Sequence, residues 1–166
     1  MRALIVGGGQ RGLRLAERLR DRGDAVRFAS RKEERRAEIE ATGAEFLLGD
    51  PDRIVTLRYA CEHVTILVWA LGTATGEDPD RVAALHGSRL QMMLERTIDT
   101  TVRGVVYEGV GTLPDEVLAE GRAVVEKMCR KNEIPFEVLE ADPSDAEAWA
   151  DAADAAIARL LASGRG

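Results

Sequence analysis

Short apolar runs alternate with stretches of helical periodicity along the whole chain. The apolar runs predict strands at 2–6, 25–29, 45–48, 64–70, 103–108 and 135–140. The patterns between and after them predict helices at 10–22, 32–41, 52–60, 80–98, 114–131 and 145–162. Strands that alternate with helices in this way are typical of a parallel sheet covered on both faces. With right-handed crossovers, the pattern predicts a doubly wound, mostly parallel, six-stranded α/β sheet of the Rossmann type, with strand order 3-2-1-4-5-6.

Length and composition narrow the class of protein. A chain of 166 residues predicts one domain, 1–166, with no separate substrate domain. The net charge of −6 argues against nucleic acid as a partner, and no apolar stretch is long enough to span a membrane. The N-terminus is predicted to be a core strand rather than a signal peptide. Cys61 and Cys129 lie far apart, without metal-ligand spacing, which favours reduced thiols in a cytoplasmic protein.

A glycine-rich turn follows the first predicted strand and precedes the first predicted helix. The segment 7–12, G-G-G-Q-R-G, matches G-x-G-x-x-G at Gly7, Gly9 and Gly12. In a dinucleotide-binding turn the first glycine permits the tight turn, the second admits the pyrophosphate, and the third brings the helix close to the sheet. Free N–H groups at the helix start, around Gln10 and Arg11, attract phosphates. The alternative is a glycine turn with a purely structural role.

The end of the second strand indicates which dinucleotide is favoured. An NAD site usually has an acidic residue there, whereas an NADP site has arginine for the 2′-phosphate. Here Ser30 and Arg31 occupy this position and Arg35 follows, so NADP is the predicted cofactor and NAD is less favoured. Arg11, inside the glycine turn, is expected to add to the same positive charge. The alternative is that these cations only form the solvated start of a helix.

The ends of the third and fourth strands supply further candidate binding residues. Asp50 follows the third strand, where its carboxylate could accept a hydrogen bond from an adenine amino group or cap the predicted helix at 52–60. Ala70, Leu71 and Gly72 follow the fourth strand and are predicted to line the ribose and pyrophosphate, unless they form a plain strand exit.

These motifs carry a resemblance to a known family. The chain resembles the N-terminal half of atypical short-chain dehydrogenase/reductases, including NAD-dependent epimerase/dehydratase-like and NmrA-like proteins. The resemblance implies an NAD(P)-binding Rossmann fold over roughly the first 110 residues. The first 70 residues also resemble the nucleotide-sensing domains of potassium-channel regulators, which normally carry the strand-two acid that this chain lacks. The residues that carry the resemblance are 7–12, Ser30-Arg31, Gly43-Ala44-Glu45, Gly49-Asp50 and the segment 60–70.

The family's catalytic residues are not carried over. Typical members use Tyr-x-x-x-Lys, in which the tyrosine transfers a proton and the lysine lowers its pKa. The residues four positions after Tyr59 and Tyr107 are histidine and glycine, and alignment places Leu118 and Arg122 where the dyad belongs. Of the segment after the fifth strand, only Thr112 has a hydroxyl group. No catalytic residue is therefore predicted, and no metal-ligand spacing is present.

Three other residues are interpreted as not functional, although His86 could take part in function, Trp69 could stack on a nicotinamide and Glu108 could act as an acid or base. His86 is expected to be an ordinary helix residue, Trp69 a core residue, and Glu108 a solvated or helix-capping carboxylate that points toward the ligand edge. Any substrate pocket is expected to come from loops 71–80 and 109–115, or from a partner subunit.

Two functions of different class follow from these interpretations. The first is a small NADP-dependent oxidoreductase of the atypical short-chain type, acting on a hydride acceptor. The second is a non-catalytic nucleotide or redox sensor that reports to a protein partner. A methyltransferase is a third alternative. A homodimer through helices 80–98 and 114–131 is also expected, with Met92, Met93 and Met128 at or near the interface.

Overall fold

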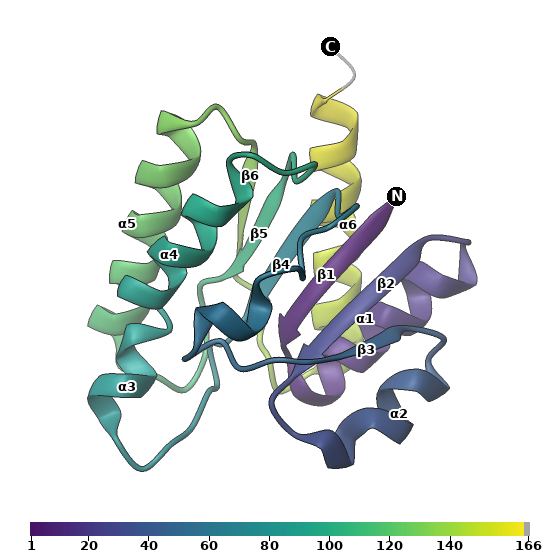
Figure 1. The fold of residues 1–166 in the computed structure, drawn as a ribbon, viewed down its shortest axis with the longest axis horizontal. Helices are drawn as coiled ribbons and strands as arrows, with labels where there is room; N and C mark the ends of the chain where they lie inside the picture. Colours follow the sequence, from purple (N-terminus) through teal and green to yellow (C-terminus); the bar gives the residue numbers. More distant parts are fainter. Residues whose placement is uncertain (165–166) are drawn as a thin grey trace.

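The computed structural model describes residues 1–164, which form one six-stranded sheet flanked by helices (Figure 1). All neighbouring strands run parallel, in the order β3-β2-β1-β4-β5-β6. The predicted fold class and strand order are therefore confirmed. The strands are β1 Arg2–Gly7, β2 Ala25–Ser30, β3 Glu45–Leu48, β4 Ile66–Ala70, β5 Val105–Glu108 and β6 Phe136–Leu139.

Helices cover both faces of the sheet (Figure 1). On one face α1, α2 and α6 bury apolar side chains against the strands, and on the other face η2, α4 and α5 do so. The helices are α1 Gly9–Asp21, η1 Glu33–Arg35, α2 Arg36–Ala41, η2 Ile54–Leu57, α3 Pro79–Ala84, α4 Ser88–Thr97, α5 Asp115–Lys131 and α6 Ala146–Ser163. Within residues 1–164, none of these helices combines the length and the apolar character needed to cross a bilayer.

The predicted helix at 52–60 is wrong. Only a short 3-10 turn, η2, forms there, because successive N–H groups bond to carbonyls three residues earlier, as from Thr56 to Arg53 and from Arg58 to Val55. The Thr56 hydroxyl also donates to the Arg53 carbonyl at 2.7 Å, and such side-chain bonds compete with α-helical pairing.

The predicted helix at 80–98 is broken into α3 and α4. The break falls at Gly87, whose φ of −130° and ψ of −108° are not helical. Helix α5 also approaches closely here, since a Cβ on Gly87 would lie 2.9 Å from Glu120 Oε1. The break turns α3 away from the sheet and toward the loop that follows β4 (Figure 1).

The centre of the sheet is apolar and closely packed. Every residue of β4 is buried, as expected for a central parallel strand. Trp69 is fully buried and belongs to the core, as predicted. Of the methionines expected near a dimer interface, Met93 and Met128 are buried in the core and Met92 is 38% exposed. The homodimer stays a prediction.

Candidate functional site

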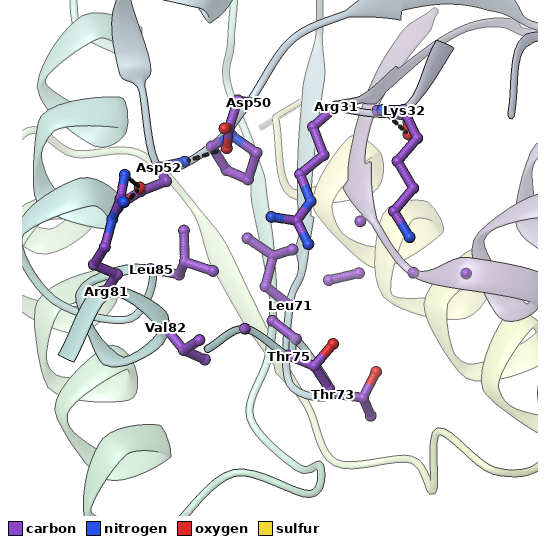
Figure 2. Close-up of a pocket in the computed structure, with 18 of the residues that line it drawn as sticks. Arg31, Lys32, Asp50, Asp52, Leu71, Thr73, Thr75, Arg81, Val82 and Leu85 are labelled. Carbon is purple, nitrogen blue, oxygen red and sulfur yellow. Dashed lines mark hydrogen bonds and ion pairs between the residues drawn. The ribbon is translucent and has the colours of Figure 1, made fainter. Parts of the chain in front are cut away.

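A cavity of about 650 Å³ lies at the carboxyl ends of β1 to β4 (Figure 2). This is the point at which the strand order reverses, where open α/β sheets bind their ligands. Its wall is built by the glycine turn, the exits of β2, β3 and β4, the loop after β4, and helix α3. The lining residues are Gly7–Gly9, Ala29–Lys32, Arg35, Asp50–Asp52, Ala70, Leu71, Thr73–Asp78, Arg81, Val82 and Leu85.

Most of the residues predicted to bind a cofactor come together in this cavity. Those that line it are Gly7, Gly9, Ser30, Arg31, Arg35, Asp50, Ala70 and Leu71. Those that do not line it are Gln10, Arg11, Gly12 and Gly72. Their roles in binding a nucleotide stay predictions.

The glycine turn has the backbone shape that the motif predicts. Gly7, Gly8 and Gly9 have φ values of 82°, 93° and 50°, which side chains rarely allow. Gly9 faces open space, because among the described residues only Arg11 Nη1 would come within 4 Å of an added Cβ. Gly12, in contrast, packs tightly: a Cβ there would lie 3.0 Å from both the Gly7 carbonyl oxygen and Phe28 Cζ. The turn is thus open where a ligand would approach and closed where α1 meets the sheet.

The start of α1 is free to bind an anion. Its first turn contains no acidic residue, and Gly8, at the N-cap, offers no side-chain acceptor. The first N–H groups of a helix have no partner within the helix itself. Together with the helix dipole, they make this end of the cavity electropositive.

Two cations at the exit of β2 reinforce this positive charge. Figure 2 shows Arg31 extending from the rim of the cavity toward Leu71, with Lys32 beside it. Among residues 1–164, neither side chain has a carboxylate within ion-pair distance. Arg35 is different, because its Nε lies 2.6 Å from Glu38 Oε1. The available charge at this position therefore comes from Arg31 and Lys32.

The exit of β3 is joined to α3 by an ion pair that the sequence analysis missed. Asp52 Oδ2 accepts hydrogen bonds from Arg81 Nε at 2.9 Å and Nη2 at 2.6 Å, and Oδ1 lies 3.4 Å from Arg89 Nε. Asp50 accepts a bond of 2.9 Å from the Asp52 N–H, so it shapes this turn without capping an α-helix. The pair closes one side of the cavity (Figure 2). No local sequence signal indicates it, since it joins a loop to a helix 29 positions away in the chain.

The side chain of Arg11 has a different partner from the one predicted. Its guanidinium does not face the Arg31 cluster but pairs with Glu108, with Nε 2.8 Å from Oε2 and Nη2 2.7 Å from Oε1. The Arg11 residue is 7% exposed and Glu108 is fully buried. The Arg11 charge is therefore paired with Glu108, and a contribution of its side chain to a phosphate site stays a prediction. Its backbone N–H stays a predicted phosphate donor.

Glu108 also differs from its expected role as a solvated or capping carboxylate. Besides holding Arg11, its Oε1 accepts a hydrogen bond of 2.7 Å from the Gly72 N–H. The Arg11 guanidinium also lies over the Trp149 ring, 5.5 Å from its centroid. One carboxylate thereby ties together the glycine turn, the exit of β4 and the end of β5.

The segment 109–113 lies directly on Gly72. The N–H groups of Thr112 and Leu113 donate to the Gly72 carbonyl at 3.0 and 3.4 Å, and a Cβ on Gly111 would overlap that oxygen. Gly72 is thus covered, which explains its absence from the main cavity. A separate cavity of about 300 Å³ lies near this segment, lined by Gly109, Val110, Gly111, Asp115, Leu118, Ala119 and Arg122. The loops 71–80 and 109–115 therefore line two different cavities.

His86 has a defined structural role rather than that of an ordinary helix residue. It is fully buried at the α3–α4 break, with Nε2 2.8 Å from the Leu71 carbonyl and Nδ1 2.7 Å from the Tyr107 hydroxyl. A carbonyl can only accept, so Nε2 carries a proton; in the neutral ring Nδ1 then accepts from Tyr107, whose hydroxyl also lies 3.3 Å from the Leu118 carbonyl. Burial lowers the pKa of His86, which favours this neutral form. The contact holds Leu71 in the cavity wall.

Comparisons with known proteins agree with the fold. No protein-family model matches the chain. The chain is 34% identical, over 94 residues, to a Bacillus subtilis (strain 168) protein named as the uncharacterized sugar epimerase YhfK. The matched segment makes up 53% of this chain and 44% of that protein.

Solved structures share the architecture at low sequence identity. Pen from Bacillus thuringiensis matches with a TM-score of 0.68 and 16% identity, covering 82% of this chain and 48% of that one. UDP-glucose 4-epimerase from Thermotoga maritima matches with a TM-score of 0.67 and 14% identity, covering 84% and 55%. The Citrobacter sp. triphenylmethane reductase complexed with NADP(H) matches with a TM-score of 0.60 and 18% identity, covering 83% and 48%. The chain spans about half the length of these proteins.

The buried Arg11–Glu108 pair generates a stability prediction. Glu108→Ala should lower the free energy of unfolding by about 3–5 kcal/mol, because it leaves the Arg11 charge buried without a partner. The double variant Arg11→Met/Glu108→Gln should recover most of this loss, since glutamine can still accept from the Gly72 N–H. Urea denaturation of each variant measures the effect.

A matched control is Glu140→Ala, which removes an exposed partner of Arg122 at 2.9 Å. Its effect should stay below about 1 kcal/mol. If the double variant is as unstable as Glu108→Ala alone, the buried unpaired charge is not the cause of the loss.

Proposed function

We propose that the chain binds NADP(H) in the main cavity and acts as a small oxidoreductase. The observation that carries this proposal is a pair of cations, Arg31 and Lys32, which have no acidic partner within residues 1–164 and lie beside an open glycine turn. The two features match the two anionic parts of NADP(H): the 2′-phosphate and the pyrophosphate.

The residues present fit the adenosine part of the molecule. Arg31 offers a planar guanidinium that can bind a phosphate through two parallel hydrogen bonds. The Ser30 hydroxyl, which accepts from the Lys32 N–H at 3.2 Å, lies beside it and adds a polar group to the same rim. Leu71, Val82 and Leu85 form an apolar wall that suits a base. Asp50 remains the candidate acceptor for the adenine amino group.

The start of α1 fits the pyrophosphate. The absence of an acid in its first turn and the open face of Gly9 leave room for an anion against free N–H groups. Solved structures with the same fold also support a nicotinamide dinucleotide, since they include a Bacillus cereus UDP-glucuronic acid 4-epimerase in complex with NAD and a reductase complexed with NADP(H).

The chemistry would come from the cofactor, because a bound NADPH supplies a hydride. The residues of this chain would hold and orient it. The chain contains no Tyr-x-x-x-Lys, so it lacks the family's usual proton donor for alcohol and carbonyl interconversion. A positioned acid or base contributes ~10²–10⁴-fold to such reactions. Acceptors that take a hydride without it, such as quinones and flavins, are therefore the substrate class that suits this site.

Cofactor preference is tested by removing the Arg31 side chain. Arg31→Ala should weaken NADPH binding by roughly tenfold or more while changing NADH binding little, because only NADPH carries the 2′-phosphate. Isothermal calorimetry with both cofactors measures this. Arg103→Ala is the matched control. Arg103 is exposed and precedes β5, so it lies at the amino ends of the strands, away from the cavity at their carboxyl ends. Equal losses for NADPH and NADH would contradict the assignment.

Activity is tested with two glycine-to-valine variants, one inside the glycine turn and one outside it. Gly9 and Gly23 both have positive φ values, 50° and 93°, and neither has an atom other than Arg11 Nη1 near an added Cβ. Valine should strain the backbone at both positions, but only Gly9→Val puts a side chain where the pyrophosphate is expected. Oxidation of NADPH with a quinone or flavin acceptor should be lost in Gly9→Val and kept in Gly23→Val.

The outcomes of this assay separate the two classes of function. Turnover that is equal in the two variants would mean that the reaction does not use the glycine turn. Tight NADPH binding without turnover on any quinone or flavin would contradict the oxidoreductase and favour a nucleotide sensor.

A further inference from the structure

The main cavity lies at the carboxyl ends of β1 to β4 and does not extend over β5 and β6. Within the described part of the chain, no residue after Leu85 lines it, so β5 and β6 contribute nothing to its wall. A dinucleotide in a doubly wound fold normally extends across both halves, with one mononucleotide over each. The side over β1 to β4 is open here, whereas the side over β5 and β6, called the closed half below, is not part of the cavity.

The closed half is held by a set of connected contacts at the end of β5. The Arg11–Glu108 pair fills the space between the glycine turn and the end of β5, with both residues buried. Glu108 holds the Gly72 N–H, and the backbone of Thr112 holds the Gly72 carbonyl. To open this half, a ligand would have to separate a buried, bidentate ion pair and expose both charges, which is costly.

The groups that attract a ligand all lie on the open side. Arg31, Lys32 and the start of α1 carry the positive charge, and Leu71, Val82 and Leu85 provide the apolar surface. From the glycine turn, the cavity continues along Thr73 and Thr75, which are half-buried and exposed, respectively. Figure 2 shows these two threonines below Leu71, on the side away from Asp50.

We propose that the adenosine 2′-phosphate and pyrophosphate supply the whole affinity for NADP(H), while the nicotinamide ring lies outside the closed half, over Thr73 and Thr75. This inference rests on the proposed function and specifies which part of the ligand the site recognises. A ring held there is accessible to a bulky planar acceptor from solvent. The oxidised and reduced cofactors then bind equally well, because the part that changes on reduction touches no buried group.

Calorimetry on the whole chain tests this with three ligands: NADP⁺, NADPH and 2′-phospho-ADP-ribose, which lacks only the nicotinamide. The three dissociation constants should agree within about threefold, a difference of well under 1.4 kcal/mol. A loss of more than about threefold on removing the nicotinamide would overturn the inference while leaving the proposed function intact. If the folded chain binds none of the three, the proposed function itself fails.

A spectroscopic measurement on the same complex gives a second readout. The reduced nicotinamide of NADPH is fluorescent, and a small neutral quencher such as acrylamide reaches it only when it is exposed. Quenching of bound NADPH should match that of free NADPH. Strong protection from acrylamide would show that the ring enters the half closed by Glu108, and would overturn the inference.

Discussion

The buried ion pair between Arg11 and Glu108 is the interaction on which the shape of the site depends. Its two residues come from the first helix and from β5, 97 positions apart in the chain. Charges in a protein interior are stable only when they are paired and their remaining hydrogen bonds are satisfied. Here the second condition is met by the Gly72 N–H, which bonds to the same carboxylate. The glycine turn, the exit of β4 and the end of β5 are therefore held as one unit.

This pair also affects how positive charge is distributed along the crevice. Arg11 is the only arginine of the glycine turn, and its charge is paired with Glu108 between α1 and the end of β5. Arg31 and Lys32 lie on the other side of the turn and have no carboxylate partner in the described part of the chain, whose net charge is −6. A local positive cluster on an acidic protein concentrates field lines and attracts a small anion to that one place. The electrostatics thus favour a phosphorylated ligand that sits toward β2 and β3.

The features predicted correctly from the sequence are those that local patterns of apolar and polar residues determine. Strand order followed from six apolar runs. The glycine spacing and Arg31 at a strand end indicated residues that line one cavity, and their binding of a nucleotide stays a prediction. Contacts between distant segments have no such signal. Nothing in the periodicity indicates that Glu108 reaches Arg11, that Asp52 pairs with Arg81, or that His86 is held by Tyr107.

The errors in helix boundaries have the same origin. A helical pattern at 80–98 is real on both sides of Gly87, but the close approach of α5 and a nonhelical glycine break it. At 52–60 the Thr56 hydroxyl and the tight turn after Asp50 favour a 3-10 conformation over the predicted α-helix. Propensity is a weak prior that such tertiary contacts override.

A crystal structure of the chain with NADP⁺ tests the proposed binding mode most directly. We expect the 2′-phosphate to contact Arg31 and Lys32, the pyrophosphate to lie at the start of α1, and the Arg11–Glu108 pair to stay unchanged. A nicotinamide ring in the space now filled by 109–113, with that pair separated, would contradict it. So would a nucleotide bound away from the glycine turn.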